Sequence, residues 1–137
     1  MHGALLLTLQ TRLLPSLNLA LGLALHFLGQ LPKKKAGHKP KSNGCGTGGL
    51  TLQTTEETTA CCDQHDFCYD TCNTEYKTCE SNFRTCLKNV CAQYSTKQDR
   101  DGCKQQNQII TMGTGLFGCG AYLESQKNAC KCPNDEL

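Results

Sequence analysis

The chain has 137 residues, a formal net charge of +2 and 12 cysteines. A length of this order suits a single domain, and so small a net charge argues against nucleic acid as a partner. Because the cysteines are dense and even in number, they predict a disulfide framework formed in an oxidising compartment. A zinc module is the less favoured alternative, since His2, His26 and His38 precede the cysteine-rich region and paired C-x-x-C knuckles are missing from the sequence.

Residues 1–31 are rich in leucine and carry Arg12 as their only formal charge. Such a segment ahead of a cysteine-rich domain predicts a signal peptide, and Ala20-Leu21-Gly22 offers small residues at a cleavage point. The uncharged stretch from Leu13 to Leu31 is nearly long enough to span a bilayer. A retained signal anchor is therefore the alternative.

Residues 32–43 are basic and contain proline and glycine, which predicts an exposed linker. The linker could touch anionic lipid, which attracts each nearby basic residue by about 1 kcal/mol, although a soluble tail is the simpler interpretation. Gly44-Cys45-Gly46-Thr47-Gly48-Gly49 follows, and alternating glycines allow a sharp turn that exposes backbone carbonyls. Such oxygens suit a hard cation like calcium, whereas a plain turn is the alternative unless a carboxylate lies nearby.

Thr54 and Glu57 fit a capping box, which predicts a helix from there to about Cys72 or Asn73. Within it, residues 61–72 hold four cysteines, one histidine and three carboxylates. On a helix Asp66 is rotated about 100° from His65, and a fixed imidazole beside a carboxylate predicts a catalytic or metal site. The alternative is a disulfide-stapled helix with incidental polar residues. The residues expected to share one side are Cys61, His65, Cys68, Tyr69 and Cys72.

A short connection over residues 73–78 leads to a second predicted helix, Cys79 to Tyr94, with Cys79, Phe83, Cys86, Val90 and Tyr94 on one face. In an antiparallel helix pair, the residue numbers of two facing residues add up to the same value along the whole pair. The residue numbers of Cys61 and Cys86 add up to the same value as those of Cys68 and Cys79. Two bridges in one register are therefore predicted, although sequence alone does not prove connectivity.

The same register places Glu80 near His65. A carboxylate there could accept a hydrogen bond from one ring nitrogen and fix the tautomer. The alternative is an exposed glutamate at the start of the helix, favoured there by the helix dipole.

The sequence after Cys91 is less informative. Residues 95–102 are predicted as loop, and residues 103–117 as a helix, although Gly113 and Gly115 each cost it about 1 kcal/mol. A short helix is expected from Ala121 to Cys132, with Cys130 and Cys132 in further bridges. The chain ends Asn134-Asp135-Glu136-Leu137, one residue different from a Lys-Asp-Glu-Leu retrieval signal, so residence in the endoplasmic reticulum lumen is an alternative to secretion.

Two motifs now resemble the secreted phospholipase A2 family. The family's active helix has the form C-C-x-x-H-D-x-C-Y, matched by residues 61–69, and its calcium loop has the form x-C-G-x-G, matched by residues 44–48. The second helix and the segment Tyr122 to Cys132 look most like the group XII branch. The resemblance covers about residues 38–137. It implies a mainly α, disulfide-rich fold in residues 44–137, with two antiparallel helices cross-linked by disulfides and a Gly-rich calcium loop.

The resemblance also implies residue roles. Asp66 would bind Ca²⁺ through its carboxylate, and the carbonyls of Gly44, Gly46 and Gly48 would complete most of the shell. Cys45 would bridge to Cys62. His65 would be the general base that activates water, with Glu80 and Tyr69 as its supporting catalytic network.

The implied reaction is calcium-dependent hydrolysis of the sn-2 ester of glycerophospholipids, which releases a free fatty acid and a lysophospholipid. The implied protein is a secreted monomer with a phospholipid membrane surface as its substrate. A catalytically weak or silent relative that binds lipid or a receptor is the alternative, and a purely structural disulfide module is a weaker one.

Three departures from the family pattern stand out. Glu80 occupies a position where the family has Asp, and its extra methylene adds about 1.5 Å of reach. The cysteine pair that group XII members carry before the calcium loop is replaced here by the basic stretch. The loop Gly46-Thr47-Gly48-Gly49 is closer to the general family form than to the group XII form, which favours ordinary calcium binding.

Overall fold

The computed structural model describes residues 31–47 and 49–132. The predictions made for the leader, for Gly48 and for the C-terminal retrieval-like tail therefore lie outside the described residues. The chain divides into two compact units, one formed by Met1–Pro32 with Cys132–Leu137 and the other by Lys33–Lys131. Only the second unit is described at any length, and all that follows concerns it.

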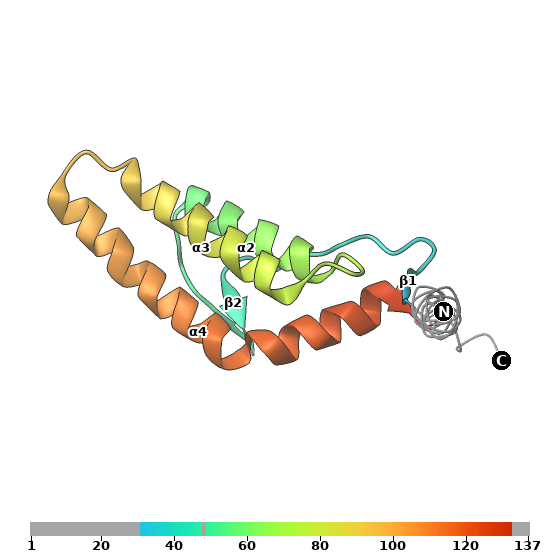
Figure 1. Ribbon diagram of the computed structural model, residues 1–137. Helices are drawn as coiled ribbons and strands as arrows, with labels where there is room; N and C mark the ends of the chain where they lie inside the picture. Colours follow the sequence, from blue (N-terminus) through green and yellow to red (C-terminus); the bar gives the residue numbers. More distant parts are fainter. Residues whose placement is uncertain (1–30, 48, 133–137) are drawn as a thin grey trace, which may run out of the picture. The chain divides into compact units, whose positions relative to one another are not determined.

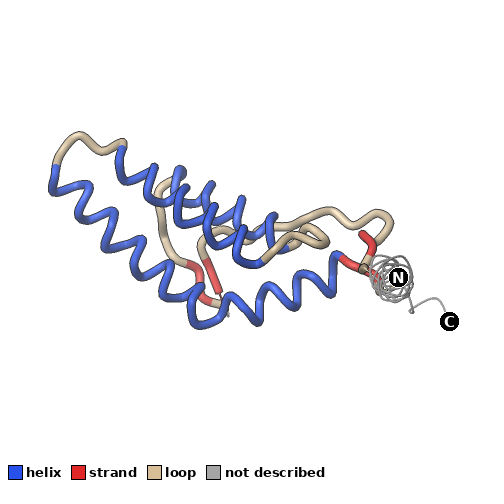
Figure 2. The backbone as a smooth tube through the Cα atoms, in the orientation of Figure 1, coloured by secondary structure: helices blue, strands red, loops and turns tan. Residues whose placement is uncertain are grey.

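Helices dominate Lys33–Lys131, as predicted. They are α2 (Glu56–Tyr69), α3 (Tyr76–Ala92) and α4 (Lys97–Ala129). Figure 1 shows α2 and α3 side by side with α4 running along them. Four strands of two residues each, drawn red in Figure 2, make two small antiparallel pairs: β1 (Lys33–Lys34) with β4 (Cys130–Lys131), and β2 (Gly46–Thr47) with β3 (Leu50–Thr51).

Disulfides staple α2 to α3 in the predicted register. Cys61 bridges Cys86 and Cys68 bridges Cys79, which confirms both pairs. Between the helices lie Phe83 and Leu87, both almost fully buried. The hairpin thus combines covalent and apolar contacts over its whole length.

The ends of α2 and α3 differ from the predicted ends. The N-cap of α2 is Thr55, whose hydroxyl accepts from the backbone N–H of Thr58, so the predicted capping box at Thr54 is wrong by one residue. The helix ends at Tyr69 rather than near Cys72, because the chain turns there and Asn73 adopts a left-handed φ of 67°. Helix α3 begins at Tyr76, three residues earlier than predicted, and ends at Ala92 instead of Tyr94.

Helix α4 is one continuous helix of 33 residues, and the predicted loop over 95–102 and the break between two helices are both wrong. The Thr96 hydroxyl accepts from the N–H of Asp99 and so caps the new start. Packing and caps outweigh the glycine penalties, as tertiary contacts do in most protein helices. Figure 1 shows a bend about halfway along α4.

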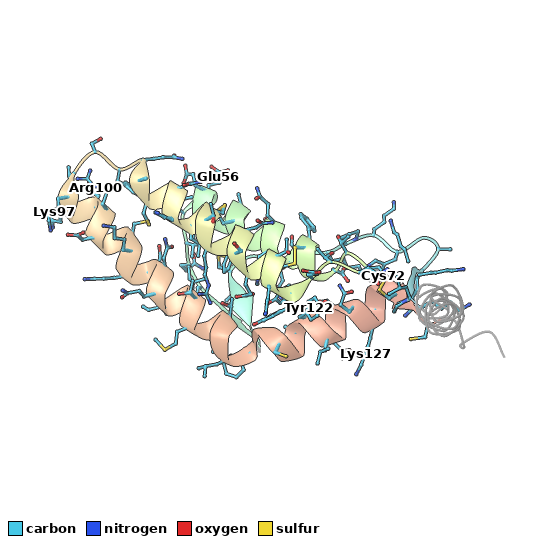
Figure 3. All side chains as sticks on the ribbon, in the orientation of Figure 1. Glu56, Cys72, Lys97, Arg100, Tyr122 and Lys127 are labelled. Carbon is cyan, nitrogen blue, oxygen red and sulfur yellow. A yellow bond between two sulfur atoms is a disulfide. The ribbon has the colours of Figure 1, made fainter. Side chains whose placement is uncertain are left out.

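Both ends of α4 are tied covalently. Cys91 of α3 bridges Cys103, and Cys72 bridges Cys130 in β4, which settles part of the connectivity that the sequence left open. Figure 3 labels Cys72 beside the last turns of α4 and Tyr122 on the side that faces the hairpin. The Tyr122 hydroxyl donates to the Thr74 carbonyl at 2.7 Å, so α4 is also held to the α2–α3 turn. Among the described residues, none of the helices combines the length and apolarity needed to cross a bilayer.

Candidate active site

His65 and Glu80 form a buried pair between α2 and α3. His65 Nε2 lies 2.7 Å from Glu80 Oε1, and the residues are 6% and 8% exposed. The alternative of an exposed helix-start glutamate is therefore wrong. A carboxylate accepts hydrogen bonds, so the contact fits the tautomer in which Nε2 is the donor. The Nδ1 lone pair is then left to act on other groups.

Two aromatic rings hold the imidazole of His65 from different sides. The ring of Phe83 is stacked on it at a centroid distance of 4.2 Å and 21°, and the ring of Tyr69 lies 4.2 Å away at 51°. The Tyr69 hydroxyl donates to Glu80 Oε1 at 2.5 Å. Burial and this hydrogen bond both raise the pKa of Tyr69 well above its ordinary value, so the phenol remains a donor at neutral pH.

The longer glutamate side chain is accommodated within this network. Both donors, His65 and Tyr69, meet the same oxygen of Glu80. Glu80 Oε2 is buried without a hydrogen-bond partner among the described residues. The extra methylene thus preserves the contact to His65 while leaving the second oxygen unused.

Three carboxylates of α2 hold the segment before the glycine loop. Asp63, Asp66 and Asp70 lie three and four residues apart, so they share one helix face. Each accepts a backbone N–H from the segment 41–44: Asp63 Oδ1 from Gly44 at 3.1 Å, Asp66 Oδ2 from Asn43 at 3.0 Å, and Asp70 Oδ2 from Lys41 at 3.0 Å.

The basic segment is therefore attached to α2, although most of its side chains are exposed. His38 Nε2 also lies 3.0 Å from Asp70 Oδ1. The roles of Asp63 and Asp70 were not predicted from the sequence. Their spacing along the helix was the available signal.

Asp66 lines an apolar pocket. Burial raises the pKa of its carboxyl, while the hydrogen bond from Asn43 and the nearby His65 act in the opposite direction. The pocket has a volume of about 210 Å³. Its polar part is formed by four predicted site residues, Gly44, Gly46, His65 and Asp66, and its apolar part by Leu50, Leu52, Phe83, Ile109, Ile110 and Phe117.

The disulfide Cys45–Cys62 that the family resemblance implied is present and fixes the glycine loop beside α2. Glu80 and Tyr69 join the site through His65, since Glu80 Oε1 lies 2.7 Å from His65 Nε2 and also accepts from the Tyr69 hydroxyl. The structure thus brings together every predicted site residue that it describes.

The donors present near Asp66 fit calcium. One carboxylate and the peptide oxygens of a glycine loop form an all-oxygen set, which a hard cation prefers. A buried carboxylate with a raised pKa is stabilised when a cation lies beside it. Across residues 31–47 and 49–132, no cluster of three or more His, Cys, Asp or Glu side chains could hold a metal ion, so the backbone would have to supply the other ligands.

Comparison with known proteins points to one family. The model of the group XII secretory phospholipase A2 precursor family matches residues 27–137. The group XIIA secretory phospholipase A2 of Homo sapiens is 33% identical over 116 residues, which cover 79% of this chain and 61% of the relative. The group XIIB secretory phospholipase A2-like protein of Mus musculus is 27% identical over 121 residues, or 79% of this chain and 62% of the relative. The chain thus spans about three fifths of the length of these curated relatives. No solved structure matches it.

Proposed function

The chain belongs to the group XII secretory phospholipase A2 family, and from this premise we propose that it hydrolyses the sn-2 ester of glycerophospholipids in a calcium-dependent reaction. One observation carries the proposal. A buried imidazole, bonded to a carboxylate through Nε2, lines the same apolar pocket as Asp66 and the glycine loop. This arrangement supports the proposal, because an imidazole, a carboxylate and an apolar wall line one small pocket.

His65 acts as the general base in this proposal. Its Nδ1 takes a proton from the attacking water, and the carboxylate of Glu80 stabilises the imidazolium that forms. Phe83 and Tyr69 keep the ring from rotating out of line, since both pack on it at 4.2 Å. His65 then returns the proton to the leaving glycerol oxygen, so that the lysophospholipid leaves as an alcohol.

Asp66 and the carbonyls of Gly44 and Gly46 would hold calcium, together with Gly48 by resemblance to the family loop. When bound, calcium supplies the charge that polarises the ester carbonyl and stabilises the oxyanion. The three hydrogen bonds from segment 41–44 to the α2 carboxylates hold the loop against Asp66. These contacts support the proposal, because they would keep the carboxylate of Asp66 and the peptide oxygens of the loop in a fixed relative position.

The apolar pocket is where an acyl chain would bind, and its rim suits a membrane surface. Leu50 and Phe117 line the pocket and are 73% and 57% exposed. Apolar side chains in this position lose exposed area on contact with lipid. The secretory relatives and the five disulfides of the described residues support a secreted protein, which we propose acts as a monomer at a phospholipid surface.

A weak or silent lipid-binding relative is the second candidate. It is favoured by Glu80, because one of its oxygens is buried without a partner in the described part of the chain. Glu80 could keep the two helices packed together and still orient the imidazole of His65 less well than an aspartate would. The first experiment separates the two candidates.

The test uses the full chain, expressed through an oxidising secretory pathway. Release of fatty acid is followed from phospholipid vesicles labelled at the sn-2 acyl chain, with calcium and with a chelator. The variants are His65→Gln and, as a matched control on the exposed surface of α3, Arg84→Gln. We expect calcium-dependent release that His65→Gln abolishes and Arg84→Gln retains. No release from folded protein would favour the lipid-binding relative, and release in chelator would overturn the role of calcium.

A further inference from the structure

A second, polar pocket adjoins the apolar pocket at Asp66. It has a volume of about 1010 Å³ and shares Gly46 and Asp66 with the apolar pocket. One wall comes from the basic segment and the other from the last third of α4. The side chains that matter here are His38, Lys39, Lys41, Ser42, Ser125 and Asn128.

The unpaired charges of this pocket are positive once Asp66 holds a cation. The other carboxylate, Asp70, is already engaged by His38 and by the N–H of Lys41. The ammonium groups of Lys39 and Lys41 belong to exposed residues, and neither forms an ion pair with another described residue. An anionic ligand would therefore meet two uncompensated cations in addition to the metal.

The uncharged part of the lining favours hydroxyl groups over quaternary ammonium. Ser42, Ser125 and Asn128 line the pocket and can each donate and accept hydrogen bonds. Quaternary ammonium groups are recognised by the faces of aromatic rings. None of the described residues that line this pocket is phenylalanine, tyrosine or tryptophan, whereas Phe83 and Phe117 line the apolar pocket.

We propose that the polar pocket binds the headgroup of the phospholipid whose acyl chain occupies the apolar pocket, and that it selects anionic, hydroxyl-bearing headgroups of the phosphoglycerol class over phosphocholine. The shared residues Gly46 and Asp66 place the ester at the junction of the two pockets. This inference rests on the proposed function, and it names the substrate class that the site prefers. A soluble glycerophosphate offers the same chemistry without a membrane.

The test compares hydrolysis of short-chain phosphatidylglycerol and phosphatidylcholine, both below their critical micelle concentrations, so that the charge of a lipid surface plays no part. The full chain is compared with the double variant Lys39→Gln, Lys41→Gln. The matched control, Lys33→Gln with Lys34→Gln, removes the same charge from β1, which does not line the pocket. We expect kcat/KM to favour phosphatidylglycerol by about fivefold to tenfold, mainly through KM.

The double variant should bring this ratio close to one, whereas the control should keep it. Equal kcat/KM for the two lipids in the unaltered chain would overturn the headgroup inference and leave the proposed function intact. The headgroup inference is also overturned if the control loses as much of the preference as the double variant.

If neither lipid is hydrolysed, the proposed function fails and the pocket is tested separately. Calorimetry then measures whether soluble glycerophosphoglycerol binds to the full chain in the presence of calcium. Binding that requires Lys39 and Lys41, with weaker binding of glycerophosphocholine, would support the pocket as an anion site. Absence of binding would overturn it.

Discussion

The α2–α3 hairpin and helix α4 differ in how their residues are fixed. The hairpin has two internal bridges and a continuous buried strip that includes Phe83, Leu87 and His65. In α4 only Ile110, Gly118 and Ala129 are buried among its 33 residues. His65 and Glu80 lie on the hairpin, while α4 supplies one wall to each pocket. The proposed function therefore assigns the base and its carboxylate to the more buried element, and much of the pocket lining to the more exposed one.

The largest expected difference is between two phenylalanines that line the same pocket. Phe83→Ala removes a ring that is 3% exposed and stacked on His65, so it should lower the free energy of unfolding by about 4 kcal/mol. Phe117→Ala on α4 removes a largely exposed ring and should change it by less than about 0.5 kcal/mol. Denaturant unfolding of both variants measures the two values. Similar losses would mean that α4 is as tightly packed as the hairpin.

Removal of the bridge Cys61–Cys86 should have a slightly smaller effect. Its cysteines are 25 residues apart, so loop-closure entropy predicts a loss of about 3.5 kcal/mol for the double serine variant. The site should loosen with it, because His65 lies one turn from Cys61 on α2. Amide hydrogen exchange would report this as faster exchange in α2 and α3 than in the middle of α4. Faster exchange confined to α4 would contradict the role given to the hairpin.

Gly118 of α4 packs against two tyrosines of the hairpin. A Cβ there would lie 2.8 Å from the Tyr69 hydroxyl and 3.3 Å from that of Tyr76. Gly118→Ala should therefore displace Tyr69 from Glu80 and destabilise the chain by about 1–3 kcal/mol.

Gly120→Ala is the matched control, since its Cβ would meet no atom within 4 Å. It should stabilise α4 by up to about 1 kcal/mol. The melting temperature should therefore fall for Gly118→Ala and rise for Gly120→Ala, as measured by thermal unfolding. A stabilising Gly118→Ala would show that α4 does not contact Tyr69.

The smallest stability effect is expected at Asp66. Because burial raises the pKa of Asp66, its contribution to stability is present at low pH and lost as the pH rises through the folded pKa. Asp66→Asn should therefore raise the melting temperature of calcium-free protein at neutral pH, and the difference should vanish below about pH 4.

Calcium should raise the melting temperature of the unaltered chain and leave that of Asp66→Asn unchanged. Asp101→Asn provides the control, because Asp101 lies on the surface of α4, where Lys97 holds the pKa of its carboxyl below the usual range. The Asp101→Asn variant should show the same calcium-dependent rise in melting temperature as the unaltered chain. An equal calcium response in all three proteins would place the metal elsewhere.

The register of the α2–α3 hairpin could be predicted because it follows from the spacing of residues that are near one another in the sequence. The seven-residue spacing of the cysteines and the antiparallel register were enough to pair Cys61 with Cys86, Cys68 with Cys79, and Glu80 with His65. The bridge Cys45–Cys62 came from resemblance to the family rather than from spacing, and it is present.

Helix α4 was mispredicted because its stability is not local. The sequence predicts one helix over residues 103–117 and another from Ala121, but the cap at Thr96 and the bridges at Cys103 and Cys130 accompany one continuous helix. The carboxylates Asp63 and Asp70 were missed for a related reason. Their partners are backbone N–H groups of a segment with no periodic pattern, and backbone donors have no signature in a sequence.

The proposed hydrolysis is tested most directly by the products of a single reaction. A glycerophospholipid with different acyl chains at sn-1 and sn-2 is incubated with the full chain and calcium in isotopically labelled water, and the products are identified by mass spectrometry. We expect the sn-2 fatty acid to be released with one labelled oxygen, and His65→Gln to release none. Release of both chains in equal amounts, or the same product from His65→Gln, would contradict the proposed function.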